Sequence, residues 1–221
     1  MQKIIIITDA YKYIVKCAIN AAGHKESAQR RACKNFIMFD VMNSIFLDSH
    51  QGKLKLIIYI YDELQDVLAN DYNYMHQKAK GYFNYSYYEK KDKAEILQKA
   101  METAIVAESM VLRTYSKNNN ERLLISLAHI RYTKAMIISE QCCLTNFLDI
   151  SLVEKAFEAI EVAFEASYND DNYLHDKKSH RARGVIKFLQ EIAVLKNLPI
   201  SKTGKNRLEN IMGKILANNK D

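Results

Sequence analysis

Proline and glycine are scarce in this chain: its 221 residues include one Pro and six Gly. Folds rich in β-sheet need turn residues about every 8–12 positions, so this scarcity favours long helices with few connections. The chain is long enough to bury a substantial core, either in one large domain or in two small ones. These features predict an all-α fold.

Long apolar runs and paired-cysteine motifs are missing as well. No run approaches the roughly 18–20 apolar residues of a membrane-spanning helix, and the apolar run near the N-terminus is too short for a secretory signal. The four cysteines show no Cys-x-x-Cys spacing, and two of them, Cys142 and Cys143, are adjacent. We therefore expect a cytoplasmic protein with reduced cysteines and no membrane association.

Apolar residues recur at helical spacing in nine segments, which predicts about nine helices. The segments are Ile4–Ala22, Ser27–Asp48, Lys53–Asn70, Tyr72–Tyr88, Ala94–Leu112, Glu121–Cys142, Ser151–Ser167, Lys177–Lys196 and Thr203–Asn218. We expect His50–Gly52 to close the second helix, and an Asp149/Ser151 cap with Glu154 in a capping box to begin the seventh. One domain, 1–221, is expected, with N-terminal helices (1–70), central hairpins (71–173) and basic C-terminal helices (174–221).

Two of these segments share a local pattern. In Lys99–Ala107 and Lys155–Ala163, Lys-Ala is followed by a bulky residue and Glu, and Ala recurs seven places after the first. The pattern resembles the second helix of a tetratricopeptide repeat, although the two copies lie 56 residues apart rather than about 34. The matching positions are Ala100, Ala104, Ala107, Ala156, Ile160 and Ala163. The resemblance implies an α-solenoid of stacked antiparallel helix hairpins that binds proteins or peptides.

Tyrosines crowd the segment Tyr72–Tyr88 and fall on two helix faces. One face holds Tyr72, Met75, Ala79 and Tyr82, and the other holds Tyr74, Lys78, Tyr85 and Tyr88. The second face is a candidate partner-binding surface, because Tyr combines a rigid apolar ring with a hydroxyl. The alternative is a core helix whose hydroxyls reach the surface.

Charge is distributed unevenly along the chain. Residues 1–173 carry 21 Lys and Arg against 22 Asp and Glu, whereas residues 174–221 carry 11 against 4. The acidic stripe Glu154, Glu158, Glu161 and Glu165 precedes the basic region, and its last three members are candidate partner-binding residues. The candidate phosphate contacts are Lys177, Lys178, Arg181, Arg183 and Lys187. Alternatively, the acidic and basic segments neutralise each other.

Evidence for catalysis or metal binding is limited. Arg122 and His129 have the Arg-x6-His spacing of HEPN-type ribonucleases, and this resemblance implies activation of a ribose hydroxyl. His175 and His180 lack a recognised ligand spacing, and no phosphate-binding glycine loop occurs. We therefore expect no metal and no cofactor.

Together these features predict a helical adaptor that binds a protein or peptide and performs no catalysis. Nucleic-acid binding through the basic C-terminal region and a metal-independent ribonuclease are the alternatives. The sequence contains no signal for the oligomeric state.

Overall fold

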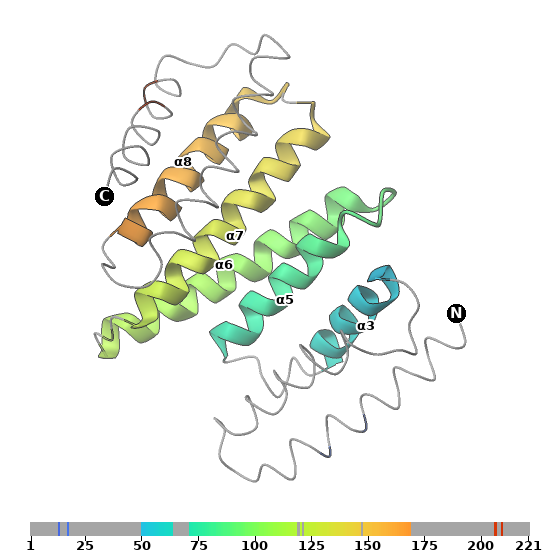
Figure 1. Ribbon diagram of the computed structural model, residues 1–221, viewed down its shortest axis with the longest axis horizontal. Coiled ribbons are helices and arrows are strands. Elements are labelled where there is room, and N and C mark those ends of the chain that lie inside the picture. The colour runs from blue at the N-terminus through green and yellow to red at the C-terminus, as the bar shows by residue number, and fades with distance from the viewer. Residues whose placement is uncertain are drawn as a thin grey trace, which may run out of the picture. The chain divides into compact units, whose positions relative to one another are not determined.

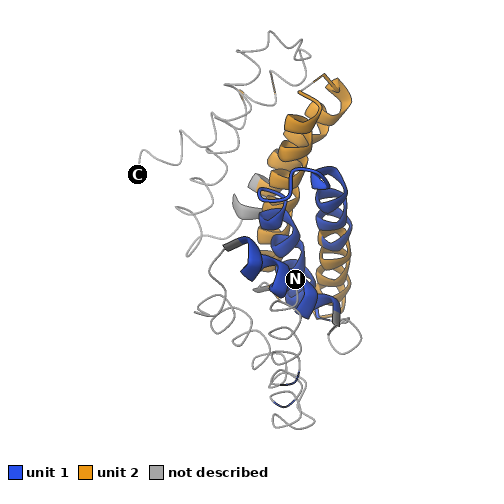
Figure 2. Cartoon of the chain, turned by 90° about the vertical axis from the view of Figure 1, so that its right-hand side faces the viewer, with its two compact units in different colours: residues 1–103 blue, residues 104–221 orange. Residues whose placement is uncertain are grey.

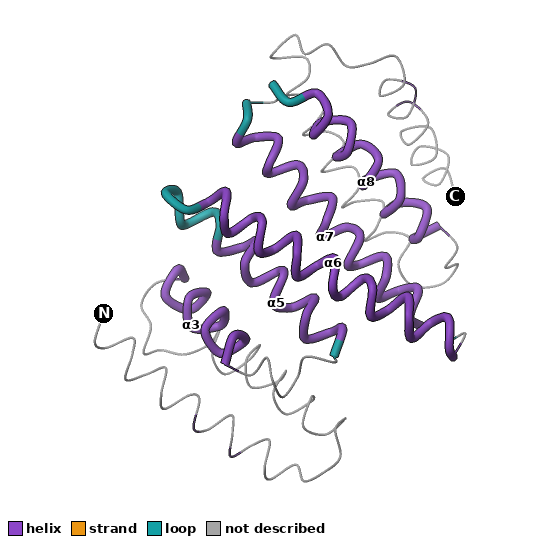
Figure 3. Tube along the Cα trace, turned by 180° about the vertical axis from the view of Figure 1, so that it is seen from behind, coloured by secondary structure: helices purple, strands orange, loops and turns teal. Residues whose placement is uncertain are grey.

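The computed structural model describes residues 50–63, 71–118, 120, 122–146 and 148–168, together with Tyr13, Cys17, Asn206 and Glu209. Five α-helices account for most of these residues, and no strand occurs among them (Figures 1 and 3). The all-α prediction is confirmed for this part of the chain. The first two and last two predicted helices lie outside the described residues, apart from those four single positions.

The chain divides into two compact units, Met1–Thr103 and Ala104–Asp221 (Figure 2). The first contains α3 (His50–Glu63) and α5 (Tyr72–Tyr85), and the second contains α7 (Arg122–Leu144) and α8 (Ile150–Tyr168). The boundary falls inside α6 (Lys93–Asn118), so this helix contributes its first turns to one unit and its remainder to the other. The predicted single domain and its subdivisions at 70 and 173 stay predictions.

In the first unit, α3 packs against α5. The buried face of α3 consists of Leu54, Leu56, Ile57, Ile60 and Tyr61. Residues His50–Gly52, which were expected to close the preceding helix, instead form the first turn of α3. The glycine is therefore accommodated inside the helix rather than after it.

Both ends of α5 are fixed by side-chain hydrogen bonds. The Asp71 carboxylate accepts from the backbone N–H of Asn73 at 2.8 Å, which caps the N-terminus. At the other end the hydroxyl of buried Ser86 donates to the Phe83 carbonyl at 2.7 Å. The helix therefore ends at Tyr85 and not at Tyr88 as predicted, and the last two tyrosines lie in the connection to α6.

In the second unit, α7 packs along α8 (Figure 1). α7 is buried on two opposite sides. One side consists of Ala128, Tyr132, Ala135, Ser139 and Cys142, and the other of Leu123, Leu127, Ile130, Thr133 and Ile137. The buried Thr133 and Ser139 hydroxyls donate to carbonyls one turn back, so neither is left without a hydrogen bond. α7 is thus covered from two sides.

Two residues in the turn between α7 and α8 end one helix and begin the next. Asn146 adopts a left-handed backbone with φ of 49°, which ends α7, and Asn tolerates this conformation better than most residues. The Asp149 carboxylate then accepts from the N–H of Leu152 at 3.0 Å and caps α8. The Asp149 cap is confirmed, but the Ser151/Glu154 capping box is wrong because Ser151 already lies inside the helix.

The small-residue positions predicted from the two matching segments are buried. Ala100 in the first unit, and Ala104 and Ala107 in the second, have no exposed surface, and α6 continues beyond them to Asn118. In α8, Ala156 and Ala163 are fully buried and Ile160 is 1% exposed. Alanine at contact positions lets helix backbones approach closely.

None of the helices in the described ranges is long and apolar enough to cross a membrane.

Truncation of Phe157 tests the packing of the second unit. This ring is 1% exposed, and Phe157→Ala is expected to lower the free energy of unfolding by about 3–5 kcal/mol, because it leaves a cavity. The neighbouring Glu158 is exposed, so Glu158→Ala should change it by less than about 0.5 kcal/mol. Urea unfolding followed by circular dichroism measures both. Equal effects of the two substitutions would contradict the assigned core.

Candidate functional site

The structure corrects the prediction that Tyr74 and Lys78 are exposed binding residues. Tyr74 is 7% exposed and Lys78 is 5% exposed, and both lie on the side of α5 that is buried in the first unit. The Tyr74 ring meets the Tyr61 ring edge-on at 4.9 Å, and its hydroxyl donates to the Tyr61 backbone carbonyl. Tyr74 therefore belongs to the core between α3 and α5, as the alternative interpretation of the aromatic helix expected.

Lys78 is part of an ionic cluster between the same two helices. Its ammonium lies 2.9 Å from the Asp62 carboxylate and 5.9 Å from the centre of the Tyr82 ring. The Tyr82 hydroxyl donates to the same carboxylate at 3.0 Å. Burial, and then the charge and hydrogen bond of Asp62, raise the pKa of Tyr82 well above its usual value. This cluster consequently serves to fix α3 on α5.

Three tyrosines gather where α5 ends. Tyr87 is 52% exposed and Tyr88 is 45% exposed, both in the turn, whereas Tyr85 in the last turn of α5 is half-buried. The Tyr85 hydroxyl donates to the Glu89 carboxylate at 3.2 Å. Tyr85 and Tyr88 thus remain candidates, and Tyr87 joins them. The sequence missed Tyr87 because a helix continued to residue 88 would have placed it on neither tyrosine face.

Two of these rings lie close to lysine ammonium groups. The Lys55 ammonium of α3 lies 5.7 Å from the centre of the Tyr85 ring, and the Lys93 ammonium of α6 lies 5.5 Å from that of Tyr87. Both distances suit cation–π attraction. Lys90 and Lys91 follow in the same turn and are exposed. We call the set Tyr85, Tyr87, Tyr88, Lys55, Lys90, Lys91 and Lys93 the tyrosine–lysine end.

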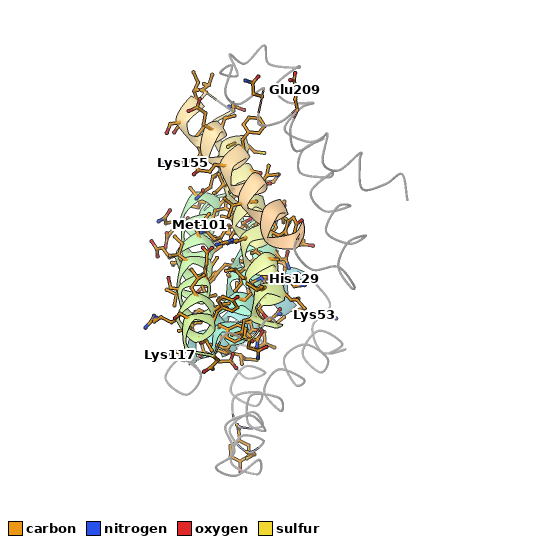
Figure 4. All side chains as sticks on the ribbon, turned by 90° about the vertical axis from the view of Figure 1, so that its left-hand side faces the viewer. Lys53, Met101, Lys117, His129, Lys155 and Glu209 are labelled. Atoms are coloured by element: carbon orange, nitrogen blue, oxygen red, sulfur yellow. The ribbon has the colours of Figure 1, made fainter. Side chains whose placement is uncertain are left out.

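The acidic candidates on α8 are described only in part. Glu154 and Glu158 are exposed, and so is Lys155 between them, which projects from α8 (Figure 4). Glu161 and Glu165 lie in the same helix, but their side chains fall outside the described residues. The candidate phosphate contacts Lys177, Lys178, Arg181, Arg183 and Lys187 also fall outside them. The roles of these residues stay predictions.

The two residues of the ribonuclease pattern lie on α7. Arg122 is its first residue, and His129 is half-buried two turns further along (Figure 4). Seven residues of α-helix span about 10 Å, and the Arg122 side chain is outside the described set. The structure therefore leaves the catalytic pairing untested.

Of the two adjacent cysteines at the end of α7, the buried one does not have a reactive thiol. Cys142 is fully buried, and burial, followed by electrostatic interactions with Cys143 and Asp149, raises the pKa of its thiol to about 12. The thiol is therefore protonated at neutral pH, whereas the thiolate is the nucleophile.

Over the described ranges, no group of three or more His, Cys, Asp or Glu is arranged to hold a metal ion.

An ion-pair cluster that the sequence did not predict joins α6 and α7 in the second unit. The Glu108 carboxylate lies 2.8 Å from the Arg131 guanidinium and 2.5 Å from the Lys134 ammonium. Burial alone would raise the pKa of Glu108, but the hydrogen bonds and charges of the two cations outweigh it and hold that pKa below its usual value. The signal available in the sequence was two cations three residues apart on one helix.

Comparison with protein-family models finds no match for this chain. Comparisons with curated proteins and with solved structures find none either. The function is therefore inferred from the residues and their geometry alone.

Neutralising Glu108 tests the charged cluster through its pH dependence. Glu108→Gln should lower the free energy of unfolding at pH 7 by about 1–2 kcal/mol, because it removes both ion pairs. The loss is no larger because the two cations keep about a quarter of their side chains exposed and can regain water. A lowered pKa in the folded state gives stability that is present above the usual value of 4.5 and is lost as the pH falls through the folded value.

The difference between wild type and Glu108→Gln should therefore shrink in acid, which urea titrations at a series of pH values measure. Glu95→Gln is the matched control, since Glu95 pairs with Lys99 on the exposed surface of α6 and should give a far smaller effect. A difference that stays constant with pH would refute the role of the Glu108 charge.

Proposed function

We propose that this chain is a protein- or peptide-binding helical adaptor and that the tyrosine–lysine end is its binding surface. One observation carries the proposal: Tyr87 and Tyr88 are each about half exposed, in the turn that also carries the exposed Lys90 and Lys91. Tyrosine is enriched at the energetic centres of protein interfaces. An exposed pair of large aromatic rings on a helical scaffold is therefore more consistent with recognition than with packing alone.

The way in which these rings are held supports the proposal. The Tyr87 ring meets the buried Phe83 ring edge-on, with ring centres 5.3 Å apart, and the Ser86 hydroxyl fixes the start of the turn. Aromatic side chains lose little conformational entropy on binding, and anchored ones lose less. The turn thus presents its tyrosines in a prepared orientation.

We retain the tetratricopeptide-like stack as part of the same proposal. Its support is the burial of Ala100, Ala104 and Ala107 in α6 and of Ala156 and Ala163 in α8, the positions at which such repeats have their close helix contacts. An adaptor of this kind also agrees with the predicted cytoplasmic location. The order and number of hairpins over the whole chain belong to the proposal.

Selection of peptides tests the proposed function directly. A random peptide library displayed on phage is selected on the full chain, and enriched peptides are synthesised and titrated by fluorescence anisotropy. Tyr88→Ala should weaken their binding by about tenfold or more, as expected at an interface centre. It should shift Tm by less than about 2 °C, because surface substitutions change stability little.

Tyr115→Ala is the matched control, since Tyr115 is a partly exposed tyrosine of α6 in the second unit. It should leave peptide binding unchanged. Failure to enrich any peptide, or equal binding by wild type and Tyr88→Ala, would overturn the proposed function.

A further inference from the structure

The tyrosine–lysine end has an excess of positive charge. Its four lysines come from α3, the turn and the start of α6, and the acids interspersed with them are Glu89 and Asp92. Glu89 is already engaged by the Tyr85 hydroxyl. Lys90 and Lys91 are exposed and form no ion pair with any residue that the structure describes. These two ammoniums can therefore receive carboxylates from a partner.

Two other lysines are oriented by the tyrosine rings. Lys55 lies over Tyr85 and Lys93 lies over Tyr87, at 5.7 and 5.5 Å from the ring centres. A long lysine side chain normally loses rotamer freedom when it binds. Lysines that already rest on a ring lose less, so the rings prepare these ammoniums for an anionic ligand.

The same contacts argue against a nucleic acid as the ligand. Proteins that bind single strands stack successive bases on open aromatic faces. Here an ammonium lies over a face of Tyr85 and another over a face of Tyr87, and Phe83 also contacts Tyr87. Stacking on those faces would displace the lysines that would neutralise the phosphates. Carboxylates meet the lysines without displacing them.

We infer that the tyrosine–lysine end binds an acidic peptide segment. Its carboxylates pair with Lys55, Lys90, Lys91 and Lys93, and an apolar side chain of the peptide packs against Tyr87 and Tyr88. This inference rests on the proposed function and specifies the class of peptide. Exposed ion pairs are individually weak, so affinity arises from several of them acting together with the aromatic contact.

The test uses the full chain and two fluorescein-labelled peptides, one of repeating Asp-Glu-Leu triplets and one of repeating Asn-Gln-Leu triplets. The two probes share shape and leucine content but differ in charge. Anisotropy titrations should show that the acidic probe binds at least about tenfold more tightly than the amide probe. Higher salt should weaken the acidic probe selectively, since screening acts on its ion pairs.

Charge reversal then locates the site. The double variant Lys90→Glu/Lys91→Glu should reduce binding of the acidic probe by about tenfold or more. The control is Lys117→Glu/Lys155→Glu, at exposed lysines of α6 and α8 in the second unit (Figure 4), which changes the net charge equally. It should leave binding close to that of wild type. Circular dichroism confirms that both variants are folded.

The remaining outcomes each overturn the inference. Equal binding of the two probes, equal loss in the two double variants, or no binding of the acidic probe would do so. Tighter binding of a labelled single-stranded oligothymidylate, lost in Lys90→Glu/Lys91→Glu, would assign the surface to nucleic acid instead. If library-selected peptides still require Tyr88 in any of these cases, the adaptor function stands and only the acidic class fails.

Discussion

The burial of alanine between the helices is the constraint on which both compact units depend. Ala79 and Ala100 in the first unit, and Ala104, Ala107 and Ala156 in the second, have no exposed surface. A methyl group at such a position allows a short separation between helix axes, and a larger side chain there would force the helices apart. Bulky rings are either enclosed in the core, like Phe157, or left partly exposed beyond the end of a helix, like Tyr87 and Tyr88.

The aromatic residues of α5 illustrate this division. Tyr74 fills a site beside Tyr61, and Lys78 and Tyr82 share the Asp62 carboxylate, so this part of the helix fixes α3 on α5. Tyr87 and Tyr88, beyond the last turn, remain partly exposed. One aromatic-rich segment thus supplies a core at one end and a candidate binding surface at the other.

Much of this fold follows from the sequence, and the remainder depends on contacts between distant residues. Helical spacing located all five described helices, and the matching alanine patterns identified buried positions, because both signals are local. The predicted end of α5 was wrong by three residues. The helix stops early because the Ser86 hydroxyl competes for the Phe83 carbonyl, and the spacing of apolar residues does not reveal this contact. The burial of Lys78 and the Glu108 cluster each require a partner more than ten residues away.

The most direct test of the account is ¹⁹F NMR of the chain labelled with 3-fluorotyrosine, with resonances assigned by single Tyr→Phe variants. An acidic peptide that binds the chain is added stepwise. The account predicts that the Tyr87 and Tyr88 resonances shift in proportion to binding while the buried Tyr74 resonance does not. Binding that shifts other tyrosines and leaves Tyr87 and Tyr88 unchanged would show that the tyrosine–lysine end is not the site.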